Sequence, residues 1–303
     1  MSEMDFYEAN ADWLGDRNMK SEHELVQFKN NSTVRIWYNE QIQNYASHWH
    51  TALEIILPIE NYYDAVVNQT MYHINPEEFL IIPPGEMHAL AAPESGTRFI
   101  FLFDITLILR LRGFAGIQSQ FVQPLHVTKD TFPRIYEEVY HILIQIRNEY
   151  FGENEYAELT ICSLLLNFFV KFGYNHVYTH DLFPNVQQSK QKEYVQKFND
   201  LLEYINLHFA EDLTLENTAS YVGFSKYHFS RLFKQYTGYT FNDYLSYRRI
   251  KAAEELLANP ELSITEIAMQ SGFASISTFN RLFKQRKNCT PGKFRALNDR
   301  IPF

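Results

Sequence analysis

The sequence predicts a multidomain chain, with a β-rich N-terminal part and an all-α C-terminal part. Residues 33–105 contain short β-branched or aromatic runs separated by Asn, Pro and Gly turns, which is typical of a small sandwich or barrel. From Phe132 to Gly173 apolar residues recur at three- and four-residue steps, the period of an amphipathic helix. From about Glu193 onward the pattern is helical and contains an internal repeat.

Four segments follow from these patterns in a chain of 303 residues. We predict a β-barrel domain over residues 1–130 and an antiparallel pair of helices over residues 131–175. A polar linker over residues 176–192 contains Pro184, which favours a break between helices. The all-α domain then covers residues 193–303.

The charge distribution favours DNA binding by the C-terminal part. The net charge of the chain is −9, which taken alone argues against nucleic-acid binding. From Lys190 onward, however, there are 16 basic and 12 acidic residues, whereas residues 1–189 contain 11 basic and 24 acidic residues. An acidic front joined to a mildly basic C-terminal part is the asymmetry expected of a sensor fused to a DNA-binding domain.

Composition also bears on the compartment. No continuous apolar run approaches the roughly 18–20 residues needed to cross a bilayer. The acidic segment Met1–Asp5 does not resemble a secretory signal. Cys162 and Cys289 lie far apart in the sequence, and we expect both to be free thiols. We therefore expect a cytoplasmic protein.

The C-terminal part contains a repeated segment. Phe229–Gln235, with the sequence FSRLFKQ, recurs 50 residues later as Phe279–Gln285, with the sequence FNRLFKQ. Each copy follows a short helical pattern that ends in a Gly-Phe pair, and Gly permits the left-handed backbone of a tight turn. Each copy therefore predicts a helix-turn-helix unit. The alternative is a helical bundle whose basic faces are merely solvated.

The second helix of each unit has a polar face that fits DNA. In the first unit the residues expected on this face are Lys226, Tyr227, Ser230, Arg231 and Lys234. Such a helix enters the major groove, where Arg pairs with guanine and hydroxyl or amide groups pair with other base edges. Lys234 and Lys284 are expected to contact phosphates, which fix position without reading sequence.

Residues 195–297 resemble the tandem helix-turn-helix domain of the AraC/XylS regulators. Arg249–Leu257 resembles the helix that connects the two units of that family, and Ser263–Phe294 resembles its signature segment. For the first unit the resemblance implies base contacts from Tyr227, Ser230 and Arg231. For the second unit it implies base contacts from Ile276, Ser277, Asn280 and Arg281. Asn288 stands where the family has Gly, and Ile276 would contact a thymine methyl group or no base.

The N-terminal part carries a second set of polar residues. His48, His50 and Glu54 form a His-x-His-x₃-Glu pattern, and a Pro-Gly segment precedes His88. These segments resemble the two motifs of the cupin β-barrel, although Asn61 and Ala92 replace its usual Gly and Asn. Three imidazoles and one carboxylate suit Zn, Ni, Fe or Mn.

The same residues also fit a pocket without a metal, as in the sensor domains of AraC-type regulators. We therefore expect no resident cofactor, and a divalent metal remains the alternative. Aromatic faces that stack on a sugar ring and polar groups that hold its hydroxyls would form such a pocket. The candidate ligand-binding residues are Trp37, Tyr45, His48, His50, Glu54, Tyr72 and His88. The resemblance further implies a homodimer formed through the helical pair, double-stranded promoter DNA as a partner, and RNA polymerase as a possible further partner.

The sequence thus predicts a ligand-responsive, sequence-specific transcriptional regulator that is not an enzyme. Its fold class is a cupin-like β-barrel with a helical dimerisation pair, followed by an all-α tandem helix-turn-helix domain. Two alternatives remain open. One is a metal-dependent cupin enzyme with an accessory DNA-binding domain, and the other is a DNA-binding regulator with no small-molecule effector.

Overall fold

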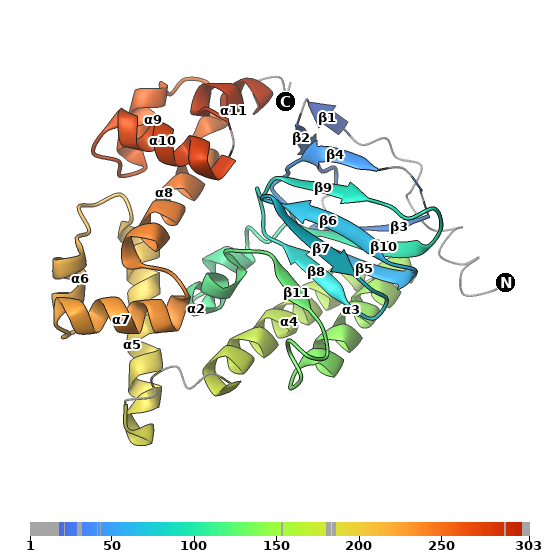
Figure 1. Cartoon of the computed structure of the whole chain (residues 1–303), viewed down its shortest axis with the longest axis horizontal. Coiled ribbons are helices and arrows are strands. Elements are labelled where there is room, and N and C mark those ends of the chain that lie inside the picture. The colour runs from blue at the N-terminus through green and yellow to red at the C-terminus, as the bar shows by residue number, and fades with distance from the viewer. Residues whose placement is uncertain are drawn as a thin grey trace. The chain divides into compact units, whose positions relative to one another are not determined.

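The computed structural model describes residues 18–20, 22–28, 32–40, 42, 44–152, 154–179, 183, 186–287 and 289–298. The chain divides into two compact units. The first consists of residues 1–110 and 121–176, and the second of residues 111–120 and 177–303. The first unit is β-rich and the second is helical, which confirms the predicted order of the two classes (Figure 1).

The first unit contains two antiparallel sheets. The five-stranded sheet has the order β11 (Leu125–Val127), β8 (Phe79–Ile82), β5 (Leu53–Glu60), β10 (Thr97–Phe103) and β3 (Val34–Asn39). The four-stranded sheet has the order β4 (Tyr45–His48), β9 (His88–Ala91), β6 (Tyr63–Val67) and β7 (Thr70–Ile74). A short hairpin joins β1 (Asn18–Lys20) to β2 (His23–Leu25).

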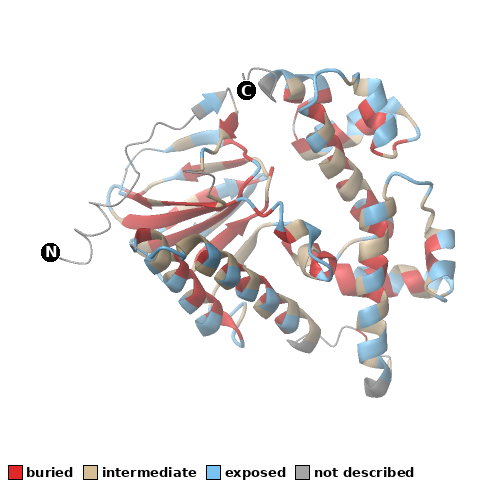
Figure 2. Cartoon of the chain, turned by 180° about the vertical axis from the view of Figure 1, so that it is seen from behind, coloured by how far each residue is buried: buried red, intermediate tan, exposed pale blue. Residues whose placement is uncertain are grey.

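The two sheets share a hydrophobic core. Ile56 and Leu80 of the five-stranded sheet pack in one cluster with Tyr63, Ala65 and Leu90 of the four-stranded sheet. All seven residues of β10 are buried, because the other face of its sheet is covered by helices (Figure 2). Burying each large apolar side chain contributes about 1.5–3 kcal/mol to folding. The inner face is therefore an environment in which charged groups need partners.

Two helices cover the outer face of the five-stranded sheet. They are α3 (Tyr136–Phe151) and α4 (Ala157–Thr179), within which the predicted helical periodicity lies. Phe168 of α4 packs against Phe79, with ring centroids 6.2 Å apart, and Phe151 of α3 lies 6.1 Å from Phe99. The carboxylate of Glu158 accepts hydrogen bonds from the backbone N–H and the hydroxyl of Thr33, each at 2.6 Å. These contacts hold both helices to the sheet.

Helix α4 differs from our expectation in one respect. Among the described residues, its segment Ala157–Val177 is the one helix long and apolar enough to cross a membrane by length and composition. Asn167 and Lys171 interrupt the apolar run, so a search for a continuous stretch misses it. One side of α4 is buried, whereas Leu159 is 69% exposed and Tyr174 is 58% exposed.

The second unit consists of helices. They are α2 (Phe114–Gln118), α5 (Gln188–His208), α6 (Leu215–Tyr221), α7 (Lys226–Thr237), α8 (Phe241–Leu257), α9 (Ile264–Gln270), α10 (Ile276–Lys287) and α11 (Pro291–Asn298). Phe198 of α5 stacks with Phe229 and Tyr236 of α7, at centroid distances of 6.3 and 5.3 Å. Cys162 and Cys289 are not joined in a disulfide, which agrees with the sequence.

The segment boundaries differ from the predicted ones. Residues 111–120, assigned from sequence to the barrel, belong to the second unit. Within it, the N–H of Gly113 donates to the Glu203 carboxylate of α5, and Ala115 is buried in the core around Phe198. Helices also enter the predicted linker 176–192 from both ends, because α4 runs to Thr179 and α5 begins at Gln188. Tertiary packing, rather than local composition, sets these limits.

The contact between α2 and α5 generates a stability prediction. A Cβ added at Gly116 would collide with the Asn199 side-chain oxygen, which is held by a 2.6 Å hydrogen bond from the Tyr236 hydroxyl. We expect Gly116→Ala to lower the free energy of unfolding by about 1–3 kcal/mol, measured by urea denaturation. Gly292→Ala is the control, because its Cβ would meet nothing within 4 Å. Equal effects of the two substitutions would contradict the close packing of α2.

Candidate nucleic-acid interface and buried histidine cluster

Helices α6 and α7 form the first helix-turn-helix pair. Thr214 caps α6 by accepting a hydrogen bond from the backbone N–H of Asn217 at 3.1 Å. After α6 the chain turns through Gly223, whose φ of 76° lies in the left-handed region that favours glycine. The turn aims α7 across α6, so Phe229 and Phe233 are buried while the opposite face of α7 is open.

Helices α9 and α10 form the second pair with the same construction. Ser263 and Glu266 make both hydrogen bonds of a capping box, at 2.7 and 3.1 Å. Gly272 provides the turn, with a φ of 82°. Phe279 and Phe283 of α10 are buried and correspond to Phe229 and Phe233 of α7. The sequence repeat is therefore a structural repeat.

The residues predicted to contact DNA lie at the surface of these two helices. On α7 the exposed members are Lys226, Tyr227, Arg231 and Lys234, and Ser230 is half-buried. On α10 all five predicted members are exposed, namely Ile276, Ser277, Asn280, Arg281 and Lys284. Each helix-turn-helix pair thus presents one arginine and one lysine at equivalent positions of its exposed face.

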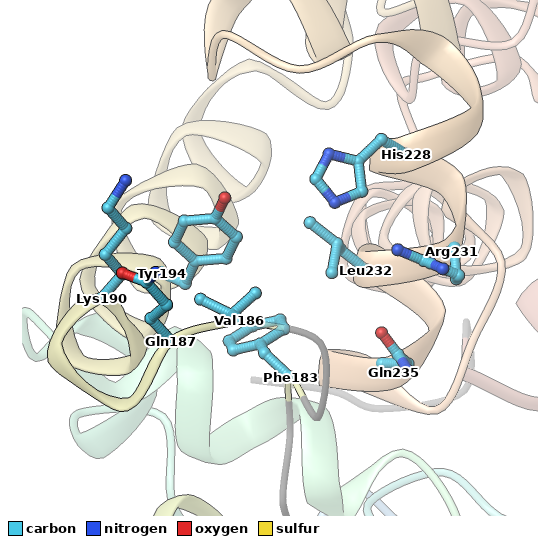
Figure 3. A pocket seen from close by; sticks show the side chains of 9 residues that line it. All are labelled: Phe183, Val186, Gln187, Lys190, Tyr194, His228, Arg231, Leu232 and Gln235. Atoms are coloured by element: carbon cyan, nitrogen blue, oxygen red, sulfur yellow. The ribbon is translucent and has the colours of Figure 1, made fainter.

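Two of these side chains have neighbours that the sequence did not indicate. Lys226 forms an ion pair with Glu216 of α6, so part of its charge is already balanced. Arg231 lines a cavity of about 240 Å³ together with His228 and Lys190 (Figure 3). Arg231 and His228 extend from α7 toward this cavity, and Phe183 and Leu232 provide apolar walls.

Helix α8 joins the two pairs. Its Arg249 guanidinium donates to the backbone oxygens of Phe209 and Glu211, both at 2.8 Å, just after α5 ends. Gly272 approaches the same place, since an added Cβ would lie 2.7 Å from the Ala210 Cα. At the other end, Glu254 of α8 forms a 2.9 Å ion pair with the buried Lys287 of α10. These contacts hold α8 to the segment after α5 and to α10. Asn288 lies outside the described residues.

In the β-rich first unit, the structure brings together the four predicted histidine and glutamate residues. His48 ends β4, His88 begins β9 as its cross-strand partner, and Glu54 is the second residue of β5. His50 lies between β4 and β5. One ligand atom from each of the four residues lies within 4.8 Å of the others, and all four side chains are buried. The cluster therefore connects the two sheets.

The electrostatics of the cluster centre on Glu54. Its carboxylate oxygen Oε2 lies 2.6 Å from His50 Nε2 and 3.2 Å from His88 Nε2. Burial alone would raise the pKa of Glu54, but the His88 and His50 imidazoles hold this pKa well below its usual value. Burial alone would lower the pKa of His88, but the Glu54 carboxylate raises it. Glu54 is therefore a buried carboxylate.

The aromatic residues predicted for the same pocket lie in two different places. Trp37 packs against Ala52, Ile100 and Leu102. Tyr45 and Tyr72 instead pack against the core cluster shared by the two sheets. The structure thus brings the imidazoles and the carboxylate together, but it places Trp37 in a different cluster from Tyr45 and Tyr72.

One acidic residue near the cluster was missed from the sequence. Glu24 of β2 is buried, and its Oε2 lies 3.4 Å from His48 Nε2. The neighbouring His23 stacks on Trp49, with ring centroids 3.9 Å apart. Glu24 precedes His48 by 24 residues in a segment without a recognisable motif, so only the pairing of the hairpin with Trp49 reveals it.

Two helix pairs with equivalent exposed basic faces, joined rigidly by one helix, define a DNA-binding protein of the helix-turn-helix class. A family model described as a helix-turn-helix domain matches residues 218–297. The regulatory protein PocR of Salmonella typhimurium is 41% identical over 99 residues, which are 33% of this chain and 33% of PocR. Both similarities lie in the C-terminal part of the chain, where the sequence resembles the AraC/XylS regulators.

Other similar proteins extend over different shares of the chain. An uncharacterized HTH-type transcriptional regulator of Staphylococcus aureus is 31% identical over 172 residues, which are 56% of this chain and 22% of that protein. The chain thus matches a third or less of the length of these curated relatives. ToxT from Vibrio cholerae O395 matches 90% of this chain and 100% of its own at 14% identity, with a TM-score of 0.45. The curated relatives named here are regulators rather than enzymes, which agrees with the expectation from sequence.

Proposed function

We propose that the chain is a ligand-responsive, sequence-specific regulator of transcription that binds double-stranded promoter DNA. The observation that carries this proposal is the repeated exposed face of α7 and α10, with Arg231 and Arg281 at equivalent positions. The two sheets of the first unit serve as a cupin-like sensor barrel in this proposal. Ligand binding would change how the second unit is presented to DNA.

The proposed contacts follow from the chemistry of each side chain. Arg231 and Arg281 pair with guanine edges in two successive major grooves, roughly 34 Å apart along the duplex. Lys234 and Lys284 neutralise phosphates one turn further along each helix. Ile276 is 38% exposed and suits a thymine methyl group rather than a polar base edge.

Substitution of the two arginines tests this assignment. We expect Arg231→Ala and Arg281→Ala each to weaken binding by about 1–3 kcal/mol and to relax specificity at one base pair. The measurement is fluorescence anisotropy with duplexes that the parent protein selects from a random-sequence pool. Lys234→Ala should instead weaken binding to all duplexes and reduce the salt dependence by about one phosphate contact.

The matched control removes the same charge elsewhere. Lys171 lies on α4 in the first unit, where it is paired with Glu138. Lys171→Ala should leave affinity and specificity close to those of the parent. If Arg231→Ala and Arg281→Ala also bound like the parent, the assigned faces of α7 and α10 would be wrong.

A homodimer through the helical pair is part of the same proposal. The outward side of α4 exposes apolar side chains, with Leu159 at 69%, Val170 at 38% and Tyr174 at 58%. Exposed apolar residues gathered on one element are typical of an interaction surface. A second copy of the chain would cover this surface and place two DNA-binding units on one operator.

The dimer proposal predicts a change of oligomeric state. We expect Leu159→Lys to convert the dimer to a monomer, because a charge would be buried in the interface. Sedimentation velocity measures this directly. Leu207→Lys is the control, because Leu207 is 80% exposed on α5 in the other unit. A monomeric parent protein, or a dimer that survives Leu159→Lys, would exclude this interface.

The proposed effector is a sugar or a related small metabolite. We expect one sugar class to raise the thermal unfolding midpoint of the intact protein, since a ligand at 100 times its dissociation constant adds about 2.7 kcal/mol. Trp37→Ala should abolish this shift if the Trp37 side chain stacks on the sugar ring. If no sugar in the panel moved the midpoint or changed DNA affinity, the proposal of a sugar effector would fail and a regulator without a small effector would be favoured.

A further inference from the structure

We propose that the second unit contains a binding site for a small organic carboxylate, in the cavity between the start of α5 and α7. The cavity has a volume of about 240 Å³, below the roughly 300–1,000 Å³ typical of pockets for drug-sized ligands. All of its lining residues belong to the second unit, so the site is separate from the histidine cluster of the first. Binding of the carboxylate does not depend on the proposed regulatory function, whereas its effect on DNA rests on that function.

The first observation is the charge of the cavity wall. Lys190 of α5 and Arg231 of α7 line the cavity from opposite sides, and His228 lies on the same helix as Arg231 (Figure 3). Among the residues that the structure describes, the wall has no acidic side chain, and neither the Lys190 nor the Arg231 side chain makes a hydrogen bond or ion pair. Two cations that share a cavity without a carboxylate favour an anionic ligand.

The second observation is that α5 begins at the cavity. Gln187 precedes the helix, and within the described part of the chain its side chain makes no capping hydrogen bond. The first N–H groups of a helix lack partners within the helix and carry partial positive charge, which favours an anion. Because Gln187 and Lys190 both line the cavity, this positive helix end adds to the potential of the Lys190 and Arg231 side chains.

The third observation is an apolar part of the wall that is held in place. Its members are Phe183, Val186, Tyr194 and Leu232. Phe183 is fully buried, and Gln191 Nε2 donates to the backbone oxygens of Phe183 and Val186, at 2.7 and 3.1 Å. A bare inorganic anion would leave this apolar surface uncovered. Apolar surface beside cationic groups instead suits an aryl or branched aliphatic body that carries one carboxylate.

Arg231 connects the cavity with DNA binding. The guanidinium that is proposed to pair with a guanine edge also borders the cavity. The fork of one guanidinium cannot hold a bound carboxylate and a base edge at the same time. The carboxylate therefore competes with DNA for Arg231, and its binding weakens the contact of the first helix-turn-helix pair with DNA.

The first experiment uses 3-phenylpropionate as a probe and its neutral amide as the comparison. The full chain is titrated with each compound at constant ionic strength, and binding is measured by ligand-observed NMR. We expect a dissociation constant of about 1 mM or below for the acid. We expect binding of the amide to be weaker by about tenfold, because it cannot form charge-assisted hydrogen bonds with Lys190 and Arg231. Equal binding of the acid and the amide, or no binding of the acid up to about 10 mM, would overturn the proposal.

Two variants locate the bound probe. Lys190→Ala removes one cation from the wall and should weaken binding of 3-phenylpropionate by about fivefold or more. Lys192→Ala is the matched control, because Lys192 is exposed near the start of α5 but does not line the cavity. It should bind the probe like the parent. Lys190 is also exposed, so both variants are expected to fold, which circular dichroism checks. Equal affinities of the two variants for the probe would refute the site.

Fluorescence anisotropy with a duplex selected by the parent protein tests the competition. A competitive ligand at twice its dissociation constant should lower the DNA affinity of the parent about threefold, and the same probe concentration should barely affect Lys190→Ala. Probe binding that left the DNA affinity of the parent unchanged would exclude competition through Arg231, while the proposed regulatory function would stand on the parent's own DNA binding. If the probe did not bind and Lys190→Ala weakened DNA binding more than Lys192→Ala, the cavity would receive a DNA phosphate and the proposal would be wrong.

Discussion

The arrangement of the second unit depends on the junction where α5 ends against α8. There the Arg249 guanidinium satisfies the two backbone oxygens that follow α5, and Gly272 allows the second turn to approach the same backbone. A side chain at Gly272 would separate these segments. The angle between the two helix pairs is thus fixed by one hydrogen-bonded arginine and one missing side chain. The second helix pair is held against the end of α5 at this junction.

The two units bury charged groups in different settings. In the second unit, aromatic residues such as Phe198 and Phe233 form the interior, and the buried Lys287 is paired with Glu254. In the first unit, the Glu54 carboxylate and the imidazoles of His48, His50 and His88 are buried together between the two sheets. Such a cluster is stabilising only if every member has a partner. Its presence between the sheets therefore points to a role other than packing.

The sequence predicted best what is encoded locally. The repeated FSRLFKQ and FNRLFKQ segments specify helix, turn and exposed face within a few residues, and the structure places each where it was expected. The set of His48, His50, Glu54 and His88 was also predictable, because strand alternation and short spacing bring them together. The transfer of residues 111–120 to the second unit was not, since it depends on the complementarity of Gly116 and α5. Glu24 was missed because its approach to His48 likewise depends on tertiary packing, here the pairing of the hairpin with Trp49.

The position of α2 limits how this protein can be recombined. Residues 111–120 leave the first unit, complete the core of the second, and return, so the chain passes between the units three times. A chimera that joined residues 177–303 to a foreign sensor would lack the helix that buries Ala115 against Phe198. The two units are therefore interleaved modules rather than interchangeable ones, and a transplant would have to carry α2 with it.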